Sequence, residues 1–142
     1  FNVVVKIAAH PRVDYGELPL IFTNRIEKEK STIELIKNAK IIFAHASTAI
    51  SWAVLYKKPI VFITSHVLNN RFQNLISTFS KELKTKLVDM NNNNLLSSLR
   101  MYQFIDETSY KRYIELYIKT KGSQEKNTWE IFAEYCKNIK HE

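Results

Sequence analysis

Residues 41–63 read IIFAHASTAISWAVLYKKPIVFI, and this stretch carries the clearest pattern of secondary structure in the chain. Its two ends, 41–44 and 60–63, are short continuous apolar runs, which is typical of strands buried on both faces. Between them, apolar residues recur at helical spacing after Ser47 or Thr48 as the helix cap. A strand, a helix and a strand at this spacing predict a right-handed crossover within a parallel sheet.

The segments on either side extend this α/β pattern. A nearly continuous apolar run predicts a buried strand over 2–9, which ends at His10-Pro11 because proline cannot continue the ladder. Ser31 and Glu34 form a capping-box pattern, so a helix is expected over 31–39. The remaining predicted elements are a short strand at 20–23, a helix at 69–84, a strand at 87–89 and a turn at 91–94.

The last third of the chain is rich in aromatic residues and predicts two amphipathic helices, over 107–121 and 127–140. Core packing is the expected reason for their apolar stripes, which comprise Tyr110, Tyr113, Leu116 and Tyr117 in the first helix and Trp129, Phe132, Ala133 and Cys136 in the second. The chain is therefore predicted to be one Rossmann-like α/β domain over 1–142. It should have three layers and a helical tail from about residue 106. The strands at 2–9, 41–44 and 60–63 are expected in one parallel sheet, with His10 and His45 at the same edge.

Composition and charge limit the classes of partner. The chain has 142 residues, of which 45% are hydrophobic and 25% charged, as in ordinary globular domains. Its formal net charge of +7 suits a nucleic acid, an anionic membrane surface or an anionic substrate. The lysines alternate with glutamates, as at 27–30, and form no continuous basic stripe, so a nucleic acid polymer is not expected as a partner.

The single cysteine, the apolar segments and the first residues of the chain bear on its disulfide bonding, its location and its domain organisation. The single cysteine, Cys136, cannot form an internal disulfide, and its expected role is that of a small core residue. No segment resembles a signal peptide or an apolar stretch of about 20 residues, which favours a cytoplasmic location. Because the chain starts at Phe1 and enters a strand at once, we expect it to be a fragment of a larger two-domain protein.

Polar residues that follow predicted strands are the candidate site. In parallel sheets, ligands bind outside the carboxyl ends of the strands, so a phosphate-bearing ligand is expected there. Histidine, arginine and hydroxyl groups all bond phosphate, and the candidates are His10, Arg12, His45, Ser47 and Thr48. A strand-ending histidine bonded to a carbonyl, an arginine in solvent and a serine that only caps a helix remain the alternatives.

Absent motifs narrow the chemistry further. The chain has no GxGxxG, GxxxxGK[ST], HExxH or CxxC motif, so no cofactor and no metal are expected. The acidic residues are scattered and form no recognisable acid–base pair. The catalytic residues are therefore unknown, and a general base is expected outside this chain.

The order of these elements resembles the C-terminal, donor-binding half of GT-B glycosyltransferases. VVVKIAAHPR (3–12) is similar to the strand and His-Pro motif of bacterial sialyltransferases and polysialyltransferases. ELIKNAKIIFAHASTAISWAVLYKKPIVFIT (34–64) resembles their serine turn and flanking elements, and YIELYIKTKGSQEKNTWEIFAEY (113–135) resembles a capsule-enzyme tail. CDP-glycerol phosphotransferases have a similar serine turn. The sequence departs from retaining glycosyltransferases at 51–53, where those enzymes carry a glutamate, and from the usual lysine position before His-Pro.

The resemblance implies an inverting transfer from a nucleotide-activated sugar, such as a CMP-sugar, in surface polysaccharide synthesis. His10, Ser47 and Thr48 would contact the donor phosphate, while the missing N-terminal domain would supply the acceptor site and the general base. Peripheral association with the inner face of a bacterial membrane is a further expectation. The alternative is a noncatalytic Rossmann-like binding or interaction domain whose C-terminal helices dock a partner.

Overall fold

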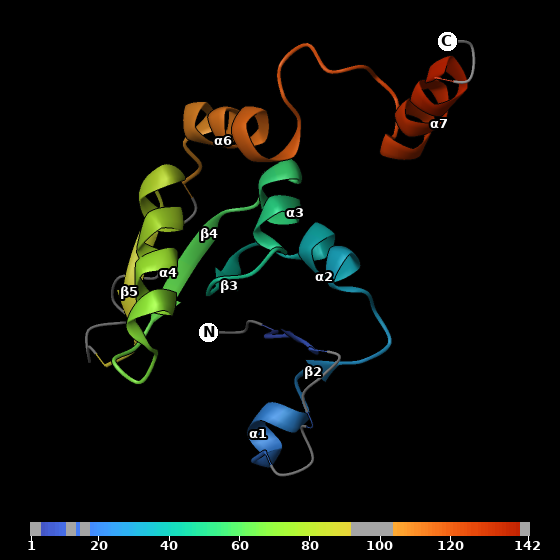
Figure 1. Cartoon of the computed structure of the whole chain (residues 1–142). Helices are drawn as coiled ribbons and strands as arrows, with labels where there is room; N and C mark the ends of the chain where they lie inside the picture. The colour runs from blue at the N-terminus through green and yellow to red at the C-terminus, as the bar shows by residue number, and fades with distance from the viewer. Residues whose placement is uncertain (1–3, 11–13, 15–17, 92–103, 140–142) are drawn as a thin grey trace.

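The computed structural model describes residues 4–10, 14, 18–91 and 104–139. Figure 1 shows the order of the elements along the chain. They are β1 (Ile7–Ala8), α1 (Leu20–Thr23), β2 (Ile26–Glu27), α2 (Thr32–Asn38), β3 (Ile42–Ala44), α3 (Ile50–Leu55), β4 (Ile60–Thr64), α4 (Asn70–Glu82), β5 (Lys86–Asp89), α6 (Glu107–Tyr113), the π-helix η2 (Ile114–Ile118) and α7 (Thr128–Ile139).

Three parallel strands in the order β3-β4-β5 form the larger of two sheets. Ile42 pairs with Ile60, and Phe62 pairs with Leu87. The strands predicted at 41–44, 60–63 and 87–89 are thus confirmed, together with the helix between the first two of them. The helix predicted at 69–84 is also confirmed as α4, whose N-cap Asn69 accepts a hydrogen bond from the Phe72 amide at 3.0 Å.

The main hydrophobic core lies on one face of the β3-β4-β5 sheet. Phe62 is fully buried there and stacks on Phe79 of α4, with ring centroids 6.1 Å apart. Ile60 of β4 and Leu83, the C-cap of α4, belong to the same cluster, and the helices contribute its other buried apolar residues, namely Ile36, Ile50, Ala53, Val54, Ile76, Tyr110 and Tyr113. On the opposite face, Val61 and Val88 pack with Ile41. The described residues form a mixed α/β unit, and the three-layer arrangement stays a prediction.

The first strand differs from its prediction. Only Ile7–Ala8 forms a strand, and Val4, expected to be buried, is 84% exposed. This strand pairs with β2 through Ile7 and Ile26 in a separate two-stranded parallel sheet. The expectation that 2–9 and 41–44 share one sheet is therefore wrong. An apolar run indicates that a segment favours a covered position, but the pairing partner depends on tertiary contacts.

Residues 20–23 form the short helix α1 rather than the predicted strand. The helix follows Pro19, and the amide of Asn24 donates to the carbonyl oxygen of Leu20 at 3.1 Å. Three consecutive apolar residues followed by a threonine have no period that separates a strand from one helical turn. The fixed φ of the preceding proline suits the start of a helix, which accounts for the outcome.

The helix predicted over 31–39 is confirmed as α2. Its capping box has both reciprocal bonds, because the Ser31 side chain accepts from the Glu34 amide and the Glu34 carboxylate accepts from the Ser31 amide. Ile36 carries its buried face. The boundary of this helix was therefore decided by local sequence.

The helix predicted over 107–121 starts as expected but changes type at residue 114. Asp106 caps α6, and Tyr110 and Tyr113 are buried as predicted. In η2 the amide of Lys119 bonds the carbonyl of Ile114, five residues back, which widens the turn. Residues after Tyr113 are therefore rotated away from the face that a regular α-helix would present to the core. Leu116 and Tyr117 are exposed, contrary to the prediction that they pack in the core.

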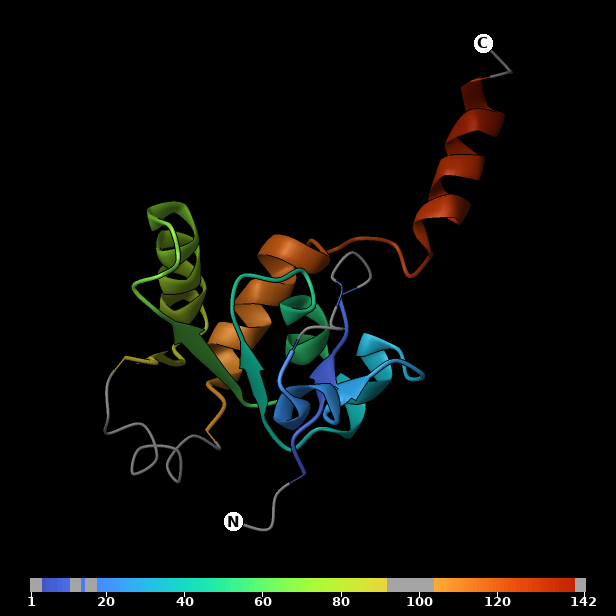
Figure 2. The same ribbon diagram turned by 90° about the horizontal axis from the view of Figure 1, so that it is seen from below.

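Helix α7 was predicted correctly in position and wrongly in burial. Every described residue of α7 is exposed, including Trp129 and Cys136, which were expected in the core. Figures 1 and 2 show the helix standing away from the rest of the chain. An amphipathic pattern indicates that one face of a helix favours an apolar partner, but it does not identify that partner. Across the described ranges, no helix combines the length and the apolar character that a bilayer crossing requires.

Two helices end in the same hydrogen-bonded motif with a lysine in the left-handed conformation. After α3, the amides of Lys57 and Lys58 donate to Val54 and Ala53, and φ of Lys57 is 49°. After α4, Lys84 has φ of 50°, and the amides of Lys84 and Thr85 donate to the carbonyls of Lys81 and Ser80. This pattern is the Schellman motif, in which glycine is the usual residue because a Cβ is unfavourable there.

Replacing Lys57 by glycine should therefore leave the chain more stable than replacing it by alanine. Both variants lose the exposed ion pair with Glu107, so their difference isolates the backbone conformation. We expect the glycine variant to exceed the alanine variant by about 1 kcal/mol in unfolding free energy. Urea denaturation measures this difference, and equal midpoints would contradict it.

A second comparison separates the core from the exposed helix. Phe62→Ala should lower the unfolding free energy by about 3–5 kcal/mol, because it opens a cavity in the core. Trp129→Ala should change it by no more than about 0.5 kcal/mol, because the indole has no buried contacts to lose. Thermal and urea denaturation test both variants. A large loss of stability in Trp129→Ala would show that α7 packs on the domain.

Candidate functional site

The carboxyl ends of β3, β4 and β5 lie at one edge of the sheet, because the three strands are parallel. Each strand is followed by polar residues, and this set is defined here as the carboxyl edge. It comprises His45, Ser47 and Thr48 after β3, Ser65 and His66 at the end of β4, and Asp89 and Asn91 at the end of β5. Ligands of open parallel sheets bind at this position.

The turn after β3 presents three exposed side chains. Nδ1 of His45 lies 3.1 Å from the carbonyl oxygen of Ala46, which makes Nδ1 the donor and leaves Nε2 for another partner. Ser47 Oγ accepts a hydrogen bond from the amide of Ala49 at 3.2 Å, so its own hydroxyl proton stays available. Within the described part of the chain, the Thr48 hydroxyl makes no hydrogen bond.

Neither Ser47 nor Thr48 is the N-cap of α3, contrary to prediction. The helix starts at Ile50, its N-cap is Ala49, and no side chain caps it. The amides of Ile50 and Ser51 donate to the carbonyls of Ser47 and Thr48 instead, which forms a tight turn before the helix. Because α3 has only six residues and starts beyond the hydroxyls, its dipole is a weaker source of anion binding than the sequence suggested.

A hydrogen-bond network joins the ends of β4 and β5. Oδ1 of Asp89 accepts from the backbone amide of Asn91 at 2.9 Å and from its side-chain amide at 2.7 Å. The same side-chain amide lies 3.4 Å from Ser65 Oγ. The backbone and side-chain bonds from Asn91 hold the pKa of Asp89 below its ordinary value, and the charge of His66 acts in the same direction. Asp89 is therefore an anion at neutral pH.

Sequence reasoning missed the residues after β4 and β5 as site candidates. The signal was present, since Ser65 and His66 directly follow the predicted strand at 60–63, and Asp89 ends the one at 87–89. The rule that selected His45 selects these residues too.

The candidates near the N-terminus are not part of this edge. His10 follows β1, which belongs to the two-stranded sheet, so His10 and His45 do not lie at the edge of a common sheet as predicted. Arg12 lies outside the described residues. The fold thus brings His45, Ser47 and Thr48 together in one turn and leaves the donor-phosphate role of His10 and Arg12 a prediction.

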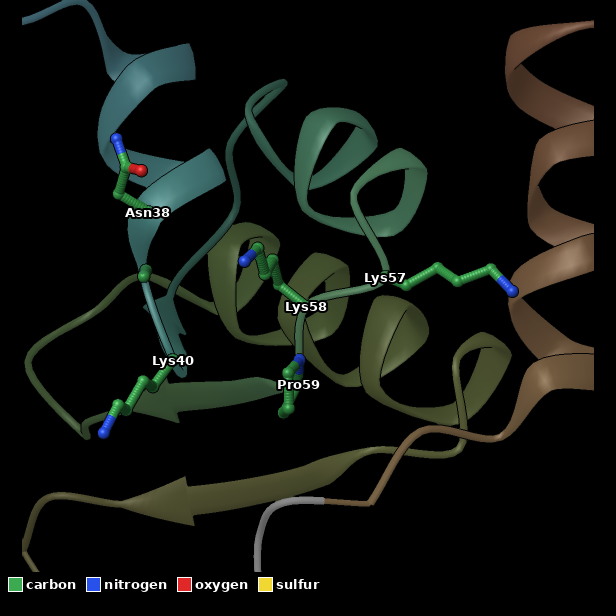
Figure 3. A pocket seen from close by; sticks show the side chains of 6 residues that line it. Asn38, Lys40, Lys57, Lys58 and Pro59 are labelled. Atoms are coloured by element: carbon green, nitrogen blue, oxygen red, sulfur yellow. The ribbon is translucent and has the colours of Figure 1, made fainter.

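An open hollow of about 550 Å³ lies at the opposite end of the strands. It is bordered by Asn38, Ala39, Lys40, Lys57, Lys58 and Pro59, which precede β3 and β4. Figure 3 shows the three lysine side chains pointing in different directions, with Lys57 extending toward α6. There it meets Glu107, with Nζ 3.0 Å from Oε2. The lysines do not converge on one point, so the hollow is a poor match to a specific ligand site.

The carboxyl edge offers hydrogen bonding rather than metal or acid–base chemistry. In the ranges that the structure describes, no three His, Cys, Asp or Glu side chains gather as a metal site would need. Hydroxyls, two imidazoles, an amide and one carboxylate suit a ligand that carries both a phosphate and hydroxyl groups.

Comparisons with known proteins add no assignment. No protein-family model, curated protein or solved structure matches the chain. The chemistry of the carboxyl edge is therefore the basis of the functional proposal.

Removal of the Asn91 side chain should raise the pKa of Asp89. In Asn91→Ala the pKa should move toward the ordinary aspartate value of about 3.9 without reaching it, because the backbone amide of residue 91 remains. Since the folded chain favours the carboxylate, this contribution to stability is present above the unfolded-state pKa and is lost as pH falls through the lowered one. NMR titration of the carboxyl carbon measures the shift. Asn138→Ala on α7 is the control, and an unchanged pKa in Asn91→Ala would refute the network.

Proposed function

We propose that this chain is the nucleotide-sugar donor-binding domain of an inverting glycosyltransferase. The observation that supports the proposal is the carboxyl edge, where three neighbouring parallel strands all end in exposed polar side chains. His45, Ser47 and Thr48 would bind the donor phosphate. A CMP-linked sugar and a role in bacterial surface polysaccharide synthesis follow from the resemblance of the sequence.

The proposed chemical role is to stabilise the departing nucleotide. When the bond to the sugar breaks, negative charge develops on the phosphate, and donors positioned beforehand lower the energy of that state. The hydroxyl protons of Ser47 and Thr48 are such donors, and Nε2 of His45 is a third when the imidazole ring carries both protons. The net charge of +7 attracts an anionic donor to the chain.

The acceptor and the general base are assigned to a separate N-terminal domain of the full protein. The described acidic residues at the carboxyl edge consist of Asp89 alone, which has no second carboxylate to act with. We also place a further layer over the face formed by Ile41, Val61 and Val88, because Phe43 on that face is 48% exposed. That layer would complete the three-layer Rossmann-like domain, in a cytoplasmic protein at the inner face of the membrane.

A second candidate function is a noncatalytic Rossmann-like interaction domain. The specific observation in its favour is α7, on which Trp129 is 79% and Phe132 57% exposed. Their rings make an edge-to-face pair, with centroids 6.3 Å apart. In this case the polar residues at the carboxyl edge would only shape turns, and no nucleotide would bind.

Calorimetric titration with CMP and with cytidine separates the two functions. CMP should bind more tightly, because hydrogen bonds to a charged group each contribute about 1.5–3 kcal/mol. Loss of the phosphate should thus weaken binding by roughly tenfold or more. Equal affinities for the two ligands would remove the phosphate site and favour the interaction domain.

Single substitutions then locate the phosphate. Ser47→Gly and Thr48→Val should each lower CMP affinity by roughly tenfold. Their melting temperatures should change little, because both side chains are exposed. Thr78→Val is the matched control, since this exposed threonine bonds the Asn74 carbonyl on α4, away from the edge. If the two variants melted at a lower temperature but bound CMP with unchanged affinity, Ser47 and Thr48 would only stabilise the turn.

His10→Ala tests the resemblance separately. If the two-stranded sheet contributes to the donor site, this variant should also weaken CMP binding by roughly tenfold. Full affinity in His10→Ala together with loss in Ser47→Gly would confine the phosphate site to the turn after β3.

A further inference from the structure

We propose that Asp89 recognises vicinal hydroxyl groups of the ligand and thereby sets the direction in which the ligand lies across the carboxyl edge. This inference rests on the proposed function and adds a second half to the same site. It assigns the phosphate to the end of β3 and the sugar hydroxyls to the ends of β4 and β5. The ligand class is thus a phosphate-bearing molecule with a vicinal diol.

The network around Asp89 leaves one carboxylate oxygen available. Both bonds from Asn91 go to Oδ1, at 2.9 and 2.7 Å, which fixes the orientation of the carboxylate. Within the described ranges, Oδ2 accepts no hydrogen bond. An ionised carboxylate oxygen has two lone pairs, so Oδ2 can accept from two neighbouring hydroxyls at once. Such charge-assisted bonds are shorter and stronger than those between neutral groups.

Ser65 complements this acceptor with a donor. Its Oγ lies 3.4 Å from Asn91 Nδ2 and 3.4 Å from the amide of Val67, and it is the acceptor in both contacts. The hydroxyl proton of Ser65 is therefore free to bond a ligand oxygen. Because sugar hydroxyls both donate and accept, a carboxylate beside a hydroxyl donor suits a diol better than a phosphate.

Charge decides which end of the ligand meets which strand. A phosphate next to the anionic Asp89 would be repelled, and Asp89 is the only carboxylate among the described residues of the carboxyl edge. The turn with His45, Ser47 and Thr48 carries no acidic residue. Neighbouring strands lie about 4.8 Å apart, which separates the ends of β3 and β5 by about 10 Å. A nucleotide or nucleotide-sugar lying across β4 can therefore span the two ends.

The diol has two sources in such a ligand, the ribose and the transferred sugar, and ligand pairs distinguish them. Calorimetry of the full chain with CMP and 2′-deoxy-CMP isolates the ribose, and CMP-sugar against CMP isolates the transferred sugar. In the unsubstituted chain, one of these pairs should differ by roughly fivefold or more. Asp89→Asn, which keeps the side-chain shape, should bring that ratio to about one, and Asp89→Ala should do the same. Glu107→Gln, far from the edge, should leave the ratio unchanged.

A phosphate-free probe keeps this inference separate from the phosphate site. Methyl β-ribofuranoside has the vicinal hydroxyls alone, and its addition should shift the NMR signal of the Asn91 side-chain amide in the unsubstituted chain but not in Asp89→Ala. That shift would support the role of Asp89 even if CMP binding failed. The inference would be overturned if substitution of Asp89 left both affinity ratios unchanged and the riboside caused no NMR shift. If CMP binding still depended on Ser47 in that case, the phosphate site would remain supported. Absence of every one of these signals would overturn both.

Discussion

Strand β4 is bonded on both sides and packed on both faces, and the rest of the described structure depends on it. It pairs with β3 through Ile60, Val61 and Phe62 and with β5 through Val61 to Thr64. Val61 and Phe62 have no exposed surface, so each side chain contributes the full free energy of burial on its own side of the sheet. A buried contact also holds the approach to β4, because the Tyr110 hydroxyl donates to the Lys58 carbonyl at 2.8 Å. Burial raises the pKa of Tyr110 well above its ordinary value and keeps that donor protonated.

The parallel pairing of β4 places the ends of three strands at one edge, and this explains why scattered polar residues become neighbours. Ser65 and Asn91 are 26 positions apart in the chain, yet their side chains meet because β4 and β5 end side by side. The turn after β3 carries no acidic residue, whereas the end of β5 carries the carboxylate of Asp89. A ligand with one anionic and one hydroxyl-bearing end would match this polarity, which is the physical basis of the proposed site.

The C-terminal helices show how the same pattern leads to opposite outcomes. Tyr110 and Tyr113 of α6 are buried, and Tyr113 continues a run of ring contacts from Phe79 to Tyr117. The wider turn of η2, in which the hydrogen bond spans five residues, then directs Ile118 toward the core in place of Leu116. Helix α7 has an equally apolar stripe and covers nothing in the described structure. Amphipathicity is a property of one helix, whereas burial requires a second surface.

Elements whose signals are local can be read from the amino-acid sequence. The capping box at Ser31 and Glu34, the N-caps at Asn69 and Asp106 and the apolar runs of β3 and β4 involve residues within a few positions of one another, so their energetics can be read along the chain. Contacts between distant segments set the partner of β1, the start of α3 beyond Thr48, the exposure of α7 and the meeting of Ser65 with Asp89 and Asn91. These features depend on which surfaces meet, and contacts between distant segments leave no periodic trace in the sequence.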